Sequence, residues 1–233
     1  MTPADIDKLL LEAAGRSVSQ EPDASAIGSA KAAIPQSLEP VRPLAPLRFF
    51  VSLFIVLFVG VAAGGAAVLG MYGFPALSWT ERIVICCVLL VTAGIAAVAT
   101  AREMSPAGGH RIAASAFVLA ALILAIAFAA LFHDYDASRF IAEGVPCLNA
   151  GLLFALPAAL VIGLLLRRGL VLDWRAAGIA AGTLAGLSGI GVLEIHCPIL
   201  KAPHVMFWHL AVVLVSGVAG FFIGWAAQKL RRS

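Results

Sequence analysis

The chain has 233 residues, of which 61% are hydrophobic and only 12% are charged, and its mean hydropathy is +1.00. A soluble domain of this length cannot hide so much apolar surface, so the composition indicates an integral membrane protein. The net charge of +3 is too small and too scattered for a nucleic-acid-binding surface, so nucleic acid is not expected as a direct partner.

Residues 2–15 are predicted to form a short helix that Thr2 caps. One face of this helix carries apolar side chains at the spacing i, i+3, i+4 and i+7, namely Ile6, Leu9, Leu10 and Ala13. A helix this short is marginal alone in water and would be stabilised by laying its apolar face in a groove of a partner protein. The alternative is a helix that rests on the membrane surface.

A polar segment over residues 16–47, rich in Ser, Ala, Gln, Glu and Pro, separates this helix from the apolar part of the chain. Such a composition is typical of a flexible tether. We therefore divide the chain into a cytoplasmic N-terminal helix and tether over residues 1–47 and a transmembrane domain over residues 48–233. The first part is too small to be a catalytic domain.

Six apolar runs follow, each close to the roughly 20 residues that an α-helix needs to cross a bilayer. They cover residues 49–70, 83–101, 112–132, 148–166, 175–194 and 205–227. Only helices and closed barrels satisfy their backbone in lipid, and these runs lack the alternation of barrel strands. The predicted fold is an all-α polytopic membrane protein with six transmembrane helices.

The basic residues gather on one side of this predicted arrangement. That side holds Lys8, Arg16, Lys31, Arg42, Arg48, Arg102, Arg111, Arg167, Arg168, Arg175, Lys229, Arg231 and Arg232, whereas the other holds only Arg82, Arg139 and Lys201. Because basic loops stay in the cytoplasm, we expect a multi-pass protein of the bacterial inner membrane with both termini cytoplasmic.

Glycines recur at four-residue spacing in three of the spans, a pattern that lets helix backbones approach closely. They are Gly60, Gly64, Gly178, Gly182, Gly186, Gly220 and Gly224. We expect them to serve helix packing and not to bind a ligand.

Two further cysteines, Cys86 and Cys87, are adjacent in the second span. Neighbouring side chains on a helix point about 100° apart, so this pair is not a redox dithiol of the C-x-x-C kind. We expect both to be small buried hydrophobic side chains.

The fourth and fifth spans form a predicted helical hairpin, because a short basic link joins them. A hairpin returns its ends to the side where it began, so Cys147 and Cys197 should share the outer face, with His196, His209 and His204 nearby. If that face is the periplasm, a disulfide can persist there. Two cysteines with one or two imidazoles can alternatively hold a soft metal such as zinc, cadmium or copper.

These options leave a sensing site, a structural disulfide and a pair of unpaired buried thiols as competing interpretations of Cys147 and Cys197. A sensing site would use Cys147, Cys197, His196 and His209, with the two cysteines as candidate metal ligands. No resident cofactor is expected, apart from a transiently bound soft metal ion.

An enzymatic alternative rests on Gly186-Leu187-Ser188-Gly189 and on His209. This set is similar to the serine–histidine dyad of rhomboid intramembrane proteases, and both parts fall in the outer half of the membrane. Serine and glycine are also ordinary helix-packing residues. A transport function is disfavoured because no ionisable residue lies at mid-depth in a span, Glu194 and His209 being near the outer rim.

Several segments, in this order, resemble the membrane anti-sigma factors called negative regulator of sigma F. They are Asp5-Ile6-Asp7-Lys8-Leu9-Leu10, Pro40-Val41-Arg42-Pro43-Leu44, Cys147, Arg167-Arg168-Gly169, His196-Cys197-Pro198 and Trp208-His209. The resemblance implies a regulator and not an enzyme. It implies a sigma factor of the extracytoplasmic-function type, held at the membrane and released on stress.

The resemblance further implies that Cys147 and Cys197 match a periplasmic cysteine pair of this family, linked to the response to heavy metals or oxidants. We expect the sigma factor to contact the apolar face of the N-terminal helix, formed by Ile6, Leu9, Leu10 and Ala13, with the region near Arg42 and the cytoplasmic loops as alternative docking sites. The tether from about Arg16 to Leu38 is longer than the usual N-terminal segment of the family.

Overall fold

The computed structural model describes residue 8 and residues 45–104 and 112–231. The chain divides into two units, Met1–Pro43 and Leu44–Ser233, and the fold concerns the second. The predicted N-terminal helix over residues 2–15, including Ile6, Leu9, Leu10 and Ala13, lies outside the described residues, as does most of the tether.

Helices, and no strands, form the described part of the chain. Six of them are long and apolar enough to cross a membrane. They are α3 (Leu47–Leu69), α5 (Trp79–Glu103), α6 (Ala113–Leu131), α7 (Phe140–Leu166), α8 (Trp174–His196) and a last span, Ala202–Leu230. That last span joins α9 (Ala202–His204), the π-helical turn η1 (Val205–His209) and α10 (Leu210–Leu230). The predicted six-span, all-α fold is confirmed.

The helix α7 begins at Phe140 and not near residue 148, so Cys147 lies within a helix and not in the loop before it. Glu143 occupies the first turn of α7. The difference arises because hydropathy marks only the apolar part of a helix, whereas the helix itself can extend past the hydrocarbon region. The position of Cys147 is therefore fixed by helix geometry.

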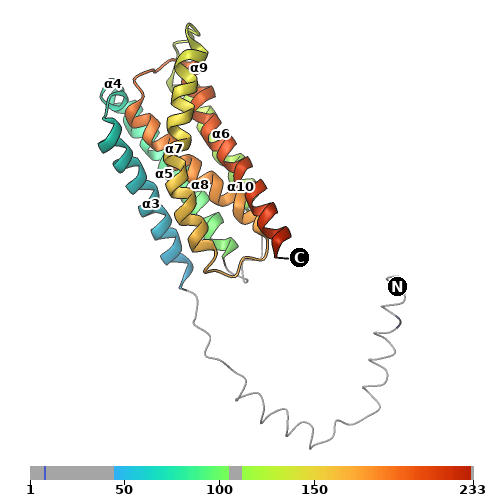
Figure 1. Ribbon diagram of the computed structural model, residues 1–233. Helices are drawn as coiled ribbons and strands as arrows, with labels where there is room; N and C mark the ends of the chain where they lie inside the picture. Colours follow the sequence, from blue (N-terminus) through green and yellow to red (C-terminus); the bar gives the residue numbers. More distant parts are fainter. Residues whose placement is uncertain (1–7, 9–44, 105–111, 232–233) are drawn as a thin grey trace, which may run out of the picture. The chain divides into compact units, whose positions relative to one another are not determined.

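The helix α8 passes through the middle of the bundle, with α3 and α10 on either side of it (Figure 1). Of its most apolar stretch, 78% is buried inside the protein, against at most 44% for any other span. It contacts α3, α5, α6, α7 and α10. Any displacement of α8 must therefore be accommodated by the other five spans.

Glycines allow the backbones of α8 and α10 to touch. A β-carbon on Gly178 would overlap the carbonyl of Gly220, and one on Gly182 would overlap the carbonyl of Ser216. The predicted packing role is confirmed for these glycines. It is wrong for Gly60 and Gly64, where a β-carbon would meet nothing within 4 Å, because that face of α3 is exposed.

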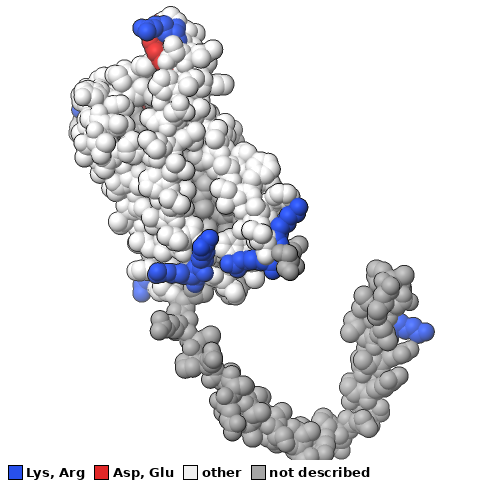
Figure 2. All heavy atoms as spheres, in the orientation of Figure 1, with Lys and Arg blue, Asp and Glu red and all other residues white. Residues whose placement is uncertain are grey.

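The spans run alternately up and down, which separates two ends of the bundle. The end that we call the basic end holds the described residues Arg48, Arg102, Arg167, Arg168, Arg175, Lys229 and Arg231 (Figure 2). Here the backbone N–H of Leu170 donates to the Met104 carbonyl at 3.1 Å. The opposite end, which we call the cysteine end, holds the start of α7, the end of α8 and α9.

Cys86 and Cys87 are exposed on the outer surface of α5, so the prediction that they are buried is wrong. In a membrane protein an apolar side chain can pack against lipid as well as against other helices, since lipid is equally apolar. Hydrophobicity alone therefore does not distinguish a core position from a lipid-facing one.

Candidate functional site

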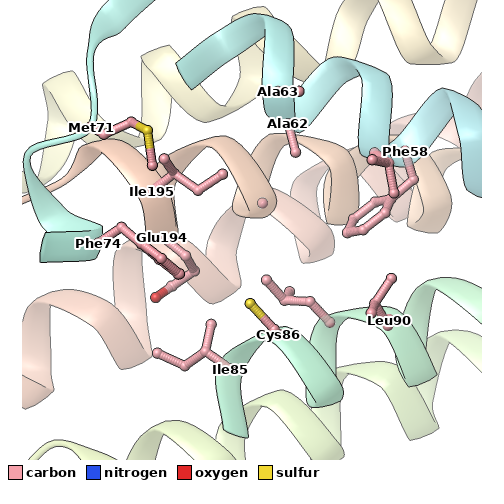
Figure 3. A pocket seen from close by; sticks show the side chains of 13 residues that line it. Phe58, Ala62, Ala63, Met71, Phe74, Ile85, Cys86, Leu90, Glu194 and Ile195 are labelled. Atoms are coloured by element: carbon pink, nitrogen blue, oxygen red, sulfur yellow. The ribbon is translucent and has the colours of Figure 1, made fainter. Parts of the chain in front are cut away.

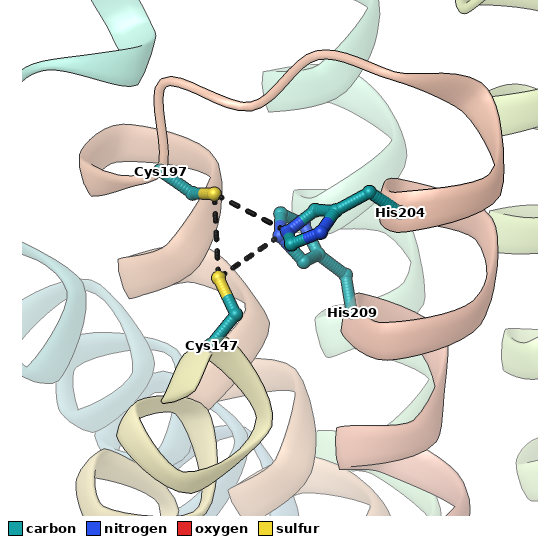
Figure 4. Close-up of side chains that lie close together, drawn as sticks. All are labelled: Cys147, Cys197, His204 and His209. Atoms are coloured by element: carbon teal, nitrogen blue, oxygen red, sulfur yellow. Dashed lines mark hydrogen bonds between the residues drawn. The ribbon is translucent and has the colours of Figure 1, made fainter. Parts of the chain in front are cut away.

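The two cysteines of the predicted hairpin meet at the cysteine end. Cys147 from α7 donates from its thiol to the sulfur of Cys197, which follows α8, with 3.3 Å between the sulfur atoms (Figure 4). Both thiols are free, since a disulfide would bring the sulfur atoms to about 2.05 Å. Cys197 is buried and Cys147 is partly buried. The structure thus holds a reduced pair beside the membrane-spanning core.

Two imidazoles complete this group. Nε2 of His204 lies 3.5 Å from the sulfur of Cys197, and Nε2 of His209 lies 3.7 Å from the sulfur of Cys147. All four potential ligand atoms lie within 4.8 Å of one another. Figure 4 shows both rings directed toward the sulfur atoms. We call Cys147, Cys197, His204 and His209 the thiol–imidazole cluster.

The π-helical turn η1 explains why two histidines five positions apart face the same way. In an α-helix of 3.6 residues per turn, His204 and His209 would point roughly 140° apart. A π-helical turn closes i→i+5 hydrogen bonds and so places residues five apart over one another. Their ring centroids are accordingly 5.4 Å apart. Because an i, i+5 spacing does not by itself indicate a shared face, no signal in the sequence indicates that His204 belongs to the site.

A buried carboxylate orients His209. Oε1 of Glu194 lies 2.6 Å from Nδ1 of His209, and the two residues are only 4% and 2% exposed. An ionised carboxylate can only accept, so Nδ1–H donates and the other ring nitrogen, Nε2, faces the sulfur atoms. Sequence reasoning placed Glu194 near the outer rim but gave it no role.

His196 does not join the thiol–imidazole cluster, although it precedes Cys197 directly. Its Nδ1 lies 3.2 Å from the carbonyl oxygen of Gly70, and its ring contacts that of Tyr72 edge-on at 5.6 Å. The helix α8 ends at His196, and Cys197 is already in extended backbone. Successive side chains at such a junction point in different directions, which sends His196 toward the segment after α3.

Ser188 and His209 do not form a serine–histidine dyad. The hydroxyl of Ser188 donates to the Leu184 carbonyl of its own helix at 3.1 Å, and Ser188 is buried in the packed centre of α8. The two ring nitrogens of His209 face Glu194 and Cys147 instead. The protease alternative is therefore wrong, and Ser188 is a helix-packing residue.

An apolar pocket of about 280 Å³ lies between α3, α5, α8 and the short helix α4 (Gly73–Ala76) (Figure 3). Its walls include Phe58, Phe74 and Cys86, and Glu194 also lines it. Exposed side chains such as Met71 stand at its margin, so it faces the lipid. Apart from Glu194 it offers no charged side chain to a ligand, and we assign it no role.

A polar latch joins two of the loops at the cysteine end, the one before α7 and the one after α8. Nζ of Lys201 lies 2.6 Å from Oδ2 of Asp136, and the backbone N–H of Ala202 donates to the Asp134 carbonyl at 2.6 Å. Hydrogen bonding from Lys201 and Ser138 holds the pKa of Asp136 well below its usual range, and Asp136 in turn raises the pKa of Lys201. The latch fixes the loop that leads into α9 and so helps to position His204.

Hydrogen bonding also distinguishes the two sulfur atoms. The contact with the Cys147 thiol, followed by those with His204 and His209, lowers the pKa of the Cys197 thiol. Thiolates, and not thiols, bind metals and attack disulfides. These hydrogen bonds thus stabilise the thiolate form of Cys197.

Comparison with known proteins agrees with this architecture. The family described as negative regulator of sigma F matches residues 35–229. A protein of Azospira oryzae (strain ATCC BAA-33 / DSM 13638 / PS), named probable anti-sigma-F factor NrsF, is 44% identical over 50 residues, which cover 22% of this chain and 24% of that protein. The match thus spans about a quarter of that relative's length.

No solved structure matches the chain. The family match, by contrast, extends from the segment before the first span to the end of the last. It is a family of regulators and not of enzymes, in agreement with the absence of a serine–histidine dyad among the described residues. The chain belongs to the negative regulator of sigma F family.

Proposed function

We propose that this protein is a membrane anti-sigma factor that holds a sigma factor of the extracytoplasmic-function type in the cytoplasm. Release would follow a change at Cys147 and Cys197 on the periplasmic side, caused by a metal or an oxidant. Family membership supports regulation of a sigma factor, and the named relative is itself a probable anti-sigma-F factor.

The distribution of charge supports the proposed orientation. The described basic residues of the loops and helix ends gather mainly at the basic end (Figure 2), which the positive-inside rule assigns to the cytoplasm of a bacterial inner membrane. Both the start of α3 and the end of α10 belong to that end. The cysteine end would then face the periplasm, where metals and oxidants from the environment would first reach Cys147 and Cys197.

The sigma factor would dock on the N-terminal segment. Its predicted helix offers the apolar face of Ile6, Leu9, Leu10 and Ala13, and a partner groove would stabilise a helix too short to persist alone. In sequence, the N-terminal segment continues into α3, which starts at Leu47 at the basic end. The chain thus joins the membrane domain at the end opposite Cys147 and Cys197.

The central helix offers a physical route between the two ends. Cys197 follows the last residue of α8, and Arg175 lies in its first turn at the basic end. Because α8 and α10 touch through their backbones at Gly178 and Gly182, a shift at Cys197 would move both helices as a packed unit. Such a shift changes the surface that the basic end presents to a docked partner.

The magnitudes are compatible with a switch. Changing a partner from mostly bound to mostly free requires about 5.5 kcal/mol of differential binding. Closing a loop the size of the one between Cys147 and Cys197 gives roughly 4 kcal/mol in a chain-entropy treatment, which is an upper value here because the bundle already orders both helices.

One observation carries the proposal: two free thiols from separate helices lie 3.3 Å apart at the end opposite the basic residues. The test is a sigma-dependent reporter in cells that carry Cys147→Ser, Cys197→Ser or both, exposed to cadmium or to a thiol oxidant. We expect induction to be altered while membrane insertion is retained. Cys86→Ser, a lipid-facing cysteine on α5, is the matched control and should behave as wild type.

Unchanged induction of the double-serine variant across metals and oxidants would remove the sensor role. A reporter that does not respond to deletion of the whole gene would remove the anti-sigma role itself. The two parts of the proposal therefore fail separately.

A further inference from the structure

The thiol–imidazole cluster has the donor set and the spacing of a tetrahedral metal site. Its sulfur and nitrogen atoms are separated by 3.3 Å between Cys147 and Cys197, 3.7 Å between Cys147 and His209, and 3.5 Å between Cys197 and His204. Metal–ligand bonds of zinc, near 2.3 Å to sulfur and 2.0–2.1 Å to nitrogen, put tetrahedral ligand atoms roughly 3.3–3.8 Å apart. A cation at the centre would require the sulfur atoms to separate by a few tenths of an ångström, and the remaining ligand pairs, all within 4.8 Å, to adopt the same spacing.

The orientation of the rings also suits a cation. Nε2 of each histidine, and not Nδ1, faces the sulfur atoms. On His209 the opposite nitrogen donates to Glu194 at 2.6 Å, which is the carboxylate–histidine arrangement that orients metal-binding imidazoles and raises their basicity. Nδ1 of the buried His204 has no hydrogen-bond partner within the described part of the chain. His209 is thus the better supported of the two nitrogen donors.

Charge balance selects the class of ion. Cys197 and His209 are almost fully buried, and an uncompensated charge is costly at such a position. Two thiolates neutralise a divalent cation, whereas a monovalent cation would leave one negative charge on the four-ligand site. Sulfur and imidazole donors favour zinc and its softer congener cadmium over magnesium or calcium, which prefer oxygen.

We propose that Cys147, Cys197, His204 and His209 bind one divalent cation of the zinc and cadmium class, with Glu194 as the positioning residue behind His209. Binding replaces protons on the two sulfur atoms by metal–sulfur bonds, so metal uptake releases protons to the solvent. This inference deepens the proposed sensor, since it assigns a ligand set to the same cysteines, but it does not require a sigma factor.

The test uses the purified, reduced full-length chain in detergent, stripped of metal by a chelator and titrated with zinc or cadmium. We expect one ion per chain, a cadmium–thiolate absorption band, and no uptake of magnesium. Cys147→Ser and Cys197→Ser should abolish the band. Glu194→Gln removes no ligand and should weaken zinc binding about 10–100-fold, and His209→Ala should weaken it more.

Two control variants separate this site from unspecific thiol chemistry. His196→Ala removes the imidazole that precedes Cys197 but faces Gly70, and Cys86→Ser removes a lipid-facing thiol. Both should bind zinc as wild type does. If His204→Ala and His209→Ala also bind as wild type does, or if the wild-type chain takes up no zinc or cadmium, the proposed ligand set is wrong.

X-ray absorption at the zinc edge of the wild-type protein makes the result independent of how well the variants fold. The proposed ligand set predicts two sulfur and two nitrogen neighbours, and four sulfur neighbours or a shell of oxygen would contradict it. If the purified protein binds no metal, the proposed anti-sigma function is not contradicted, because metal uptake is measured without a sigma factor. Normal metal uptake with an unresponsive reporter would instead contradict the proposed function.

Discussion

Oε1 of Glu194 lies 2.6 Å from Nδ1 of His209, and this buried contact ties the last turn of α8 to the π-helical turn before α10. The pair holds the central helix α8 and the last span together at the cysteine end, directly behind the sulfur atoms. The same carboxylate also fixes the ring nitrogen that faces Cys147.

Removing this carboxylate should destabilise the bundle. Glu194→Ala leaves the Nδ1–H of His209 buried without an acceptor, at a cost of about 1–3 kcal/mol. Glu194→Gln keeps an acceptor oxygen and should lose less. Thermal loss of helicity in detergent measures both variants, and equal midpoints for Glu194→Ala and wild type would contradict the importance of the contact.

Gly73 lets α4 lie directly against the end of α8. A β-carbon there would overlap the backbone carbonyl of Cys197, which cannot move aside as a flexible side chain would. We expect Gly73→Ala to displace Cys197, to cost roughly 1–3 kcal/mol in overpacking and to slow disulfide formation with Cys147. Gly64→Ala on the open face of α3 is the matched control and should be neutral in thermal unfolding and in thiol chemistry.

The latch between Lys201 and Asp136 should make the cysteine end sensitive to acid. Because folding lowers the pKa of Asp136, its stabilising contribution is complete above the unfolded value of about 3.9 and is lost as the pH falls further. Lys201→Met should weaken this pH dependence and leave the part that the hydrogen bonds from Ser138 contribute. Proteolysis of the 133–139 loop, followed from pH 6 to pH 3, measures the effect, and parallel profiles for wild type and Lys201→Met would exclude the latch.

Oxidation should link Cys147 to Cys197. Their free sulfur atoms are 3.3 Å apart, so diamide can accept two electrons and two protons from the pair with little movement of the helices. Mass spectrometry of non-reduced peptides should find this bond, while Cys86 and Cys87 stay free, because adjacent cysteines on a helix point apart. Saturating zinc should slow the reaction, and an equal rate with and without zinc would argue against metal-bound thiolates.

The membrane fold was predictable because its main determinant is local. Any run of about 20 apolar residues must become a helix in lipid. Because Cys147 and Cys197 lie at the two ends of a hairpin of two spans, they come to the same end of the bundle. Hydropathy does not show which side of a span faces lipid. The predictions for Cys86, Cys87, Gly60 and Gly64 are therefore wrong, because all four lie on exposed surface.

The composition of the cluster was harder to predict. His196 is predicted to join the site because it precedes Cys197 in the sequence. The end of α8 instead turns its ring toward Gly70. His204 faces the sulfur atoms only because η1 is a π-helical turn, and no pattern of hydropathy distinguishes such a turn from an α-helix. Glu194 enters the site through a tertiary contact between two spans, which only the packed bundle defines.

The most direct test of the account is the amount of the proposed sigma factor that stays with membranes containing the full-length protein. Membranes are prepared from cells with and without cadmium or diamide, for wild type, the Cys147→Ser/Cys197→Ser double variant and Cys86→Ser. The account predicts that treatment releases the sigma factor from wild-type and Cys86→Ser membranes but not from the double variant. Equal retention by treated and untreated wild-type membranes, or equal release from the double variant, would contradict it.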